Sequence, residues 1–108
     1  MKKEKMIEKE KVIQAIFRAV DELNQQLPRR QRLRKSVDTF LFGDHGVLDS
    51  LGLVNLIVTT EQKIEEEFGI AITLSDEKAL SQKDNSPFET IEKLADYISL
   101  FLEEKADG

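Results

Sequence analysis

The sequence predicts a small all-α protein, and its hydrophobic periodicity is the main reason. Apolar residues recur at helical intervals over about residues 5–27, 50–68 and 87–102. The one alternating stretch, residues 70–74, has no second strand with which to pair. A chain of 108 residues is the size of one domain and buries about two-thirds of its extended-chain surface on folding. We therefore expect a single domain over residues 1–108, a four-helix bundle with an ordered core at about 6–102.

Composition excludes several classes of function. Cysteine is absent, so disulfide bonds, thiolate nucleophiles and cysteine-based zinc sites are excluded. The longest apolar run, around residues 53–58, is too short to span a bilayer. The charged N-terminal residues lead into an amphipathic helix rather than into the apolar core of a signal peptide. We expect a cytoplasmic protein that does not insert into membranes.

The net charge of −5 is unevenly distributed along the chain. Residues 1–35 hold 11 Lys or Arg and 5 Asp or Glu, whereas residues 36–108 hold 5 and 16. The acidic part contains Ser50, the residue on which the functional interpretation depends. A surface of this sign favours basic protein partners and disfavours nucleic acid.

The helix expected at 5–27 ends at Pro28, which cannot continue it. Residues 28–49 show no sustained period, and a connection of this length is usually functional. Its scattered apolar residues predict that it is pinned to the core. Its basic run, residues 29–35, is not interleaved with aromatic residues, which disfavours contact with nucleic acid or an anionic membrane. It could instead be a solvated loop, contact an acidic protein surface, or discriminate among partner enzymes.

The next helix begins at Asp49 or Ser50, both residue types that cap helix N-termini well, and ends at Phe68. Gly69 then occupies the position where a left-handed C-terminal cap is favoured. Residues 70–74 read as an extended connection, and a short helix follows over residues 75–80.

The last helix is expected to start at a capping box. Ser86 is its predicted N-cap, Pro87 its first residue and Glu89 the residue that completes the box. Thr90 is a second possible cap.

Three blocks of sequence occur in a recognisable order. They are Leu48-Asp49-Ser50-Leu51, the end of the apolar helix at residues 65–70, and residues 90–98. Together they resemble the acyl carrier protein family over about residues 7–102. In that family the serine of the Asp-Ser-Leu block receives 4′-phosphopantetheine from coenzyme A, and acyl groups are held as thioesters on this arm.

The resemblance implies a stand-alone, monomeric carrier without catalytic activity of its own. It implies that Ser50 is the attachment site, with Asp49 and Leu51 beside it. It also implies that Leu51 and three further residues face partner enzymes, namely Val54, Asn55 and Glu61. The partners implied are a phosphopantetheinyl transferase and acyl-loading and acyl-processing enzymes, and the acyl chain would be sheltered between the second and third helices.

Two features depart from the family pattern. The helix that follows Ser50 is about one turn longer, which adds about 6 Å. Positions that are often acidic in carriers for fatty-acid synthesis are Gly52 and Asn55 here. Both features favour dedicated partners, in a specialised lipid or secondary-metabolite pathway, over the general fatty-acid enzymes.

Other readings of the same residues remain open. The chain could be an aminoacyl or peptidyl carrier, or an unmodified helical adaptor in which Ser50 only caps a helix. A catalytic triad is disfavoured because Ser50 and Asp49 are adjacent and His45 is the only histidine, whereas triads converge from separate segments. Residues 65–67 are consecutive glutamates that point around a helix, so we expect no metal site.

Overall fold

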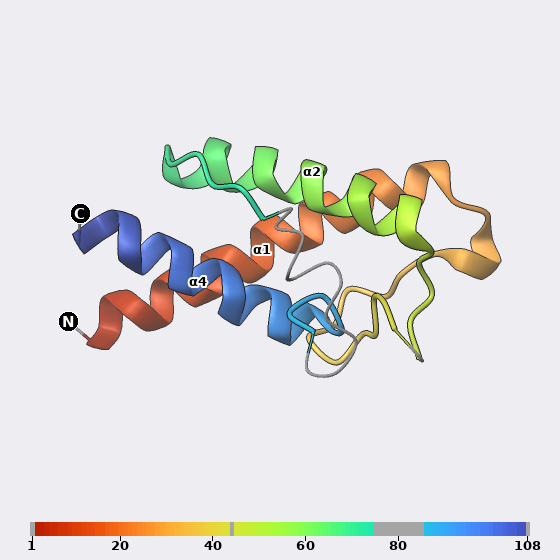
Figure 1. Cartoon of the computed structure of the whole chain (residues 1–108), viewed down its shortest axis with the longest axis horizontal. Coiled ribbons are helices and arrows are strands. Elements are labelled where there is room, and N and C mark those ends of the chain that lie inside the picture. Colours follow the sequence, from red (N-terminus) through yellow and green to blue (C-terminus); the bar gives the residue numbers. More distant parts are fainter. Residues whose placement is uncertain (1, 44, 75–85, 108) are drawn as a thin grey trace.

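The computed structural model describes residues 2–43, 45–74 and 86–107, with side chains described between Lys9 and Glu104. The elements are helix α1 (Lys2–Gln26), the short 3-10 helix η1 (Arg29–Gln31), helix α2 (Ser50–Phe68) and helix α4 (Ile91–Asp107), as Figure 1 shows. The described part contains no strand beyond an isolated bridge between Phe40 and Thr90, so the all-α prediction is confirmed there. The short helix expected at 75–80 lies outside the described residues.

Helix α1 is central, because it packs against both α2 and α4. Ion pairs join Arg18 to Glu67 at 3.3 Å and Glu22 to Lys63 at 2.9 Å, so α2 runs antiparallel to α1. The shared core is apolar and includes Ile16, Val20, Leu53, Leu56, Ile57, Ile64, Leu94 and Ile98. In the part of the chain that the structure describes, no helix is both long enough and apolar enough to cross a membrane.

The connection between α1 and α2 is clamped where it leaves α1. The Asn24 side chain accepts a hydrogen bond from the Leu33 backbone N–H at 2.8 Å and donates one to the Leu33 carbonyl at 2.9 Å. The Arg32 Nε donates to the carbonyls of Asn24 and Leu27 at 3.1 and 3.3 Å, which satisfies two acceptors at the end of α1. Leu33 is buried, as are Leu41 and Leu48, so the prediction that apolar residues pin this connection to the core is confirmed.

The same connection also supplies acceptors to the start of α4. The backbone N–H of Ile91 donates to the Thr39 carbonyl at 3.1 Å, and that of Glu92 donates to the Val37 carbonyl at 3.0 Å. In the opposite direction, the Leu41 N–H donates to the Glu89 carbonyl at 2.7 Å. Because a helix N-terminus leaves its first N–H groups unpaired, these bonds tie the long connection to α4.

The predicted capping box at Ser86 is wrong, and Thr90 is the cap. Thr90 Oγ1 accepts from the Lys93 N–H at 3.1 Å, and α4 begins at Ile91. Ser86 instead closes a turn, since its Oγ accepts from the Phe88 N–H at 3.1 Å. Phe88 is fully buried, and the backbone next to it pairs with the connection after α1, so the helix begins only after this turn.

Candidate functional site

The segment before α2 is held in place by the core. Leu48 is buried, and its backbone N–H donates to the Leu41 carbonyl at 3.0 Å. Asp49 has an extended backbone, and its Oδ1 accepts a hydrogen bond from the Gly52 N–H at 2.7 Å. Asp49 is therefore the N-cap of α2, and Gly69 closes the other end with φ of 69° as predicted.

Ser50 is the first residue of α2 and is exposed. Within the described residues its hydroxyl makes no hydrogen bond, because the capping role belongs to Asp49. Of the two capping residues that the sequence allowed, the structure selects Asp49. The Ser50 hydroxyl is thus available for chemistry without loss of the helix cap.

Two glycines allow the chain to approach itself closely near Ser50. A Cβ on Gly52 would lie 3.2 Å from Asp49 Oδ1 and 3.2 Å from Leu48 Cδ2, so a side chain there would crowd the cap. A Cβ on Gly46 would lie 2.4 Å from the Phe42 Cα, which is closer than any real contact. The sequence marked Gly52 only as an uncharged surface position, and its role in the cap was missed.

The surface beside Ser50 is apolar. Leu51 is 71% exposed and Val54 is 41% exposed. Val47, which precedes the helix, and Val58, one turn beyond Val54, are exposed to similar extents. Leu51, Val54 and Val58 follow helical spacing along one side of α2, so they form one continuous strip.

The residues expected to face partners fall into two groups. Leu51, Val54 and Asn55 are exposed on α2. Glu61 is half-buried, and its Oε2 accepts a hydrogen bond from the Leu74 N–H at 2.6 Å. Its carboxylate therefore fastens the segment after α2 to the helix. No local sequence signal pointed to this contact, because the two residues are brought together by the turn at Gly69.

In the described part of the chain, the residues considered for a catalytic triad or a metal site do not form such a site. The His45 ring packs on Phe40 with a centroid distance of 5.2 Å, and it forms no hydrogen bond with Asp49 or Ser50. The glutamates at 65–67 are exposed, and no group of three metal-ligating side chains is found among the described residues.

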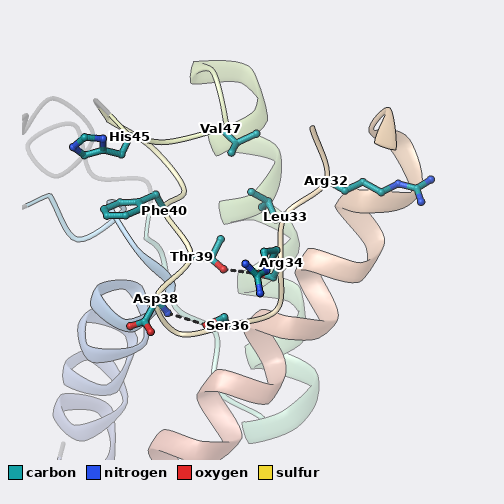
Figure 2. Close-up of a pocket in the computed structure, with 9 residues that line it drawn as sticks. All are labelled: Arg32, Leu33, Arg34, Ser36, Asp38, Thr39, Phe40, His45 and Val47. Atoms are coloured by element: carbon teal, nitrogen blue, oxygen red, sulfur yellow. Dashed lines mark hydrogen bonds between the residues drawn. The ribbon is translucent and has the colours of Figure 1, made fainter. Parts of the chain in front are cut away.

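A cavity of about 480 Å³ lies in the connection between α1 and α2 (Figure 2). Both ends of the connection line it: Leu33 and Arg34 come from the beginning, and His45 and Val47 from the end. The cavity therefore shows that the basic segment after α1 lies next to the residues that lead into α2.

Comparisons with models of protein families, with curated proteins and with solved structures give no match to this chain. The geometry around Ser50 and the three sequence blocks are thus the basis for a functional assignment.

Proposed function

We propose that this chain is a carrier protein of the acyl carrier type, a four-helix bundle in which Ser50 carries a 4′-phosphopantetheine arm. The observation that carries the proposal is the separation of two roles at the start of α2. Asp49 caps the helix at 2.7 Å from the Gly52 nitrogen, and Ser50 presents an exposed hydroxyl without a hydrogen-bond partner in the described part.

The residues at this site fit a phosphodiester. The positive end of the α2 dipole favours a negative charge by about 0.3–1 kcal/mol at an exposed position. The Gly52 N–H is engaged by Asp49 and the Leu53 N–H by the Asp49 carbonyl. The N–H groups of Ser50 and Leu51 have no acceptor among the described residues, so they remain for a phosphate oxygen.

The attachment is a transfer from coenzyme A. The Ser50 Oγ forms a bond to phosphorus, the hydroxyl proton passes to a base of the transferase, and adenosine 3′,5′-bisphosphate leaves. Asp49, which is exposed beside Ser50, would flank the metal and coenzyme site of the transferase when the two proteins are bound. Once attached, the arm supplies a terminal thiol that carries acyl groups as thioesters. The chain has no cysteine, so no side-chain thiol competes with it.

The exposed strip beside Ser50 supports contact with partner enzymes. Leu51, Val54 and Asn55 lie outward on α2, where an acyl-loading or acyl-processing enzyme has access to them. The uncharged Gly52 and Asn55 and the long α2 support a specialised lipid or secondary-metabolite pathway. We expect enzymes of general fatty-acid elongation to turn over the malonyl or acyl form poorly, and normal turnover would contradict this part of the proposal.

Co-expression with a broad-specificity phosphopantetheinyl transferase, followed by intact-protein mass spectrometry, tests the assignment. The wild type should gain the mass of one arm and Ser50→Ala should gain none. Ser36→Ala, which removes a hydroxyl in the connection between α1 and α2, is the matched control and should be modified like the wild type. If the wild type gains no mass, the chain is an unmodified helical adaptor and the proposal fails.

A further inference from the structure

The charged residues that lie near Ser50 in the structure come from both halves of the sequence, and not only from the acidic half to which Ser50 belongs. Helix α2 has no acidic residue between its start at Ser50 and Glu61. Its glutamates at 65–67 lie at the opposite end of the molecule, whereas η1 lies at the same end as Ser50 (Figure 1). Ser50 belongs to the acidic half of the sequence but lies at the basic end of the structure.

Not every cation of the basic run is available to a partner. Arg32 is hydrogen-bonded to the carbonyls at the end of α1, and Lys35 is paired with Asp21 at 3.2 Å. Arg29, Arg30 and Arg34 are exposed and have no ion pair or side-chain hydrogen bond within the described residues. A docking protein would meet these three guanidinium groups together with the exposed carboxylates of Asp38 and Asp49.

Arg34 borders the start of the apolar strip, and η1 with Arg29 and Arg30 lies at the same end of the molecule (Figure 1). Arg34 and Val47 line the same cavity, which places the basic segment beside the start of α2 (Figure 2). A second, smaller cavity is lined by Gln26 of α1 and by Val58 of α2, so the strip also borders the end of α1. We define the Ser50 face as this surface. It comprises the cations Arg29, Arg30 and Arg34, the apolar residues Val47, Leu51 and Val54, and the exposed carboxylates Asp38 and Asp49, so its cations outnumber its carboxylates by one.

We propose that the phosphopantetheinyl transferase that modifies Ser50 docks on the Ser50 face through an apolar contact flanked by acidic side chains of the transferase. This inference rests on the proposed function. An enzyme that reaches the Ser50 hydroxyl covers about 800 Å² around it, and unpaired cations in such an area favour opposing carboxylates and penalise opposing cations. The charge preference is the reverse of that expected from the acidic half of the sequence.

A protein fits this surface better than an anionic membrane does. Helices that lie on membranes carry Lys or Arg on the polar side of the same helix and aromatic residues on the apolar side. The first three turns of α2 contain neither a basic nor an aromatic residue, and the cations come from a separate clamped segment. The surface is therefore a fixed pattern of charge beside an apolar strip.

The test uses the full chain and the phosphopantetheinyl transferase of the organism that encodes it. Rates of arm transfer from coenzyme A are compared for the wild type, for R29Q/R30Q/R34Q and for the control K11E/Q14E. Both variants lower the net charge by three, and Lys11 and Gln14 are exposed on the distant half of α1. Circular dichroism confirms that the variants are folded.

The arginine variant should raise KM about tenfold at low salt with little change in kcat, because docking is weakened and the chemistry is not. Its rate should also depend less on salt than that of the wild type. The control should stay within about twofold of the wild type.

The outcomes separate the two proposals. If no protein gains the arm, including the wild type, the proposed function fails and the inference fails with it. If all are modified with equal KM, or if the arginine variant is modified faster, the function stands and the acidic docking partner is ruled out. Co-sedimentation of the wild type, but not of the arginine variant, with phosphatidylglycerol vesicles would also overturn the inference, since the surface would then be a membrane site.

Discussion

The carboxylate of Asp49 and the backbone N–H of Gly52 lie 2.7 Å apart, and this hydrogen bond determines how Ser50 is presented. Because Asp49 satisfies a free N–H of the first turn, Ser50 is not needed as a cap. The absence of a side chain at position 52 leaves room for the carboxylate. The cap therefore depends on Asp49, and the adjacent Ser50 keeps an exposed hydroxyl without a hydrogen-bond partner in the described part.

Asp49→Ala should lower the free energy of unfolding by about 1 kcal/mol, because the N-cap of α2 is lost. Asp49→Asn keeps a side-chain oxygen and should recover most of this loss. Ser50→Ala is the matched control and should stay within about 0.5 kcal/mol of the wild type, since its hydroxyl makes no bond in the described part. Urea denaturation measures all three, and a Ser50→Ala variant less stable than Asp49→Ala would contradict the assignment of the cap.

Asn24→Ala should destabilise the protein by about 1–2 kcal/mol, because the variant leaves the Leu33 N–H and carbonyl without their partner. Amide hydrogen exchange at Leu33 should accelerate at the same time. Gln25→Ala, at the exposed neighbouring position, provides the control and should change stability by less than about 0.5 kcal/mol. Unchanged exchange at Leu33 in Asn24→Ala would show that the clamp does not hold the connection.

Gly46→Ala should cost about 1–3 kcal/mol, since its methyl group would lie 2.4 Å from the Phe42 backbone and the connection must move. Amide chemical shifts of Leu41 and Leu48, which are hydrogen-bonded to each other, should change with it. Gly69→Ala is a useful comparison, because a Cβ there meets no atom within 4 Å and only the positive φ of 69° opposes it, by about 1–2 kcal/mol. If Gly46→Ala and Gly69→Ala change the amide shifts of Leu41 and Leu48 by equal amounts relative to the wild type, the close approach at Gly46 is contradicted.

The hydrogen bond to Glu22 raises the pKa of Lys63 above its ordinary value of 10.5, although partial desolvation acts in the opposite direction. A raised pKa in the folded state means that the pair stabilises the protein below pH 10.5 and that this contribution is lost as the pH rises through the folded-state value. Glu22→Gln should lower the pKa of Lys63, as followed by NMR titration of its Cε signal. Glu66→Gln removes only a weaker charge effect and should lower the pKa less. An equal change in both variants would rule out the Glu22 hydrogen bond as the main cause.

Local patterns predicted the helices well where the pattern and the packing agree. The apolar band that predicted α2 contains Leu53, Leu56 and Ile57, which are buried. It also contains Leu51, Val54 and Val58, which are exposed, so the pattern predicted the helix but not its buried side. Gly69 predicted its end. The prediction failed at Ser86. The residues of a capping box are present there, but Phe88 is buried and the neighbouring backbone pairs with the connection between α1 and α2, so the helix begins later. Local energies of capping are small, so tertiary contacts can override them.

At the candidate site, too, local features were predicted from sequence and features set by tertiary contacts were not. Asp49 and Ser50 were recognised together from sequence, yet their roles were not separable, because both residue types cap helices equally well. Glu61 resembled its exposed acidic neighbours, and only the return of the chain after Gly69 brings it to the Leu74 N–H. The charge count along the chain also does not describe the surroundings of Ser50, because η1 with Arg29 and Arg30 lies at the same end of the molecule as the start of α2.

The helical class, the bounds of α2 and the candidate serine could be predicted from sequence, because each depends on residues within a few positions of one another. Only the folded structure shows that Asp49 is the cap and that the Ser50 hydroxyl has no hydrogen-bond partner within the described residues. The fold also brings η1 and Arg34 to the end of the molecule where α2 begins. The cap is a local contact between residues three positions apart, but two adjacent residue types could have formed it. The position of the arginines depends on packing between segments far apart in the chain, which no local pattern specifies.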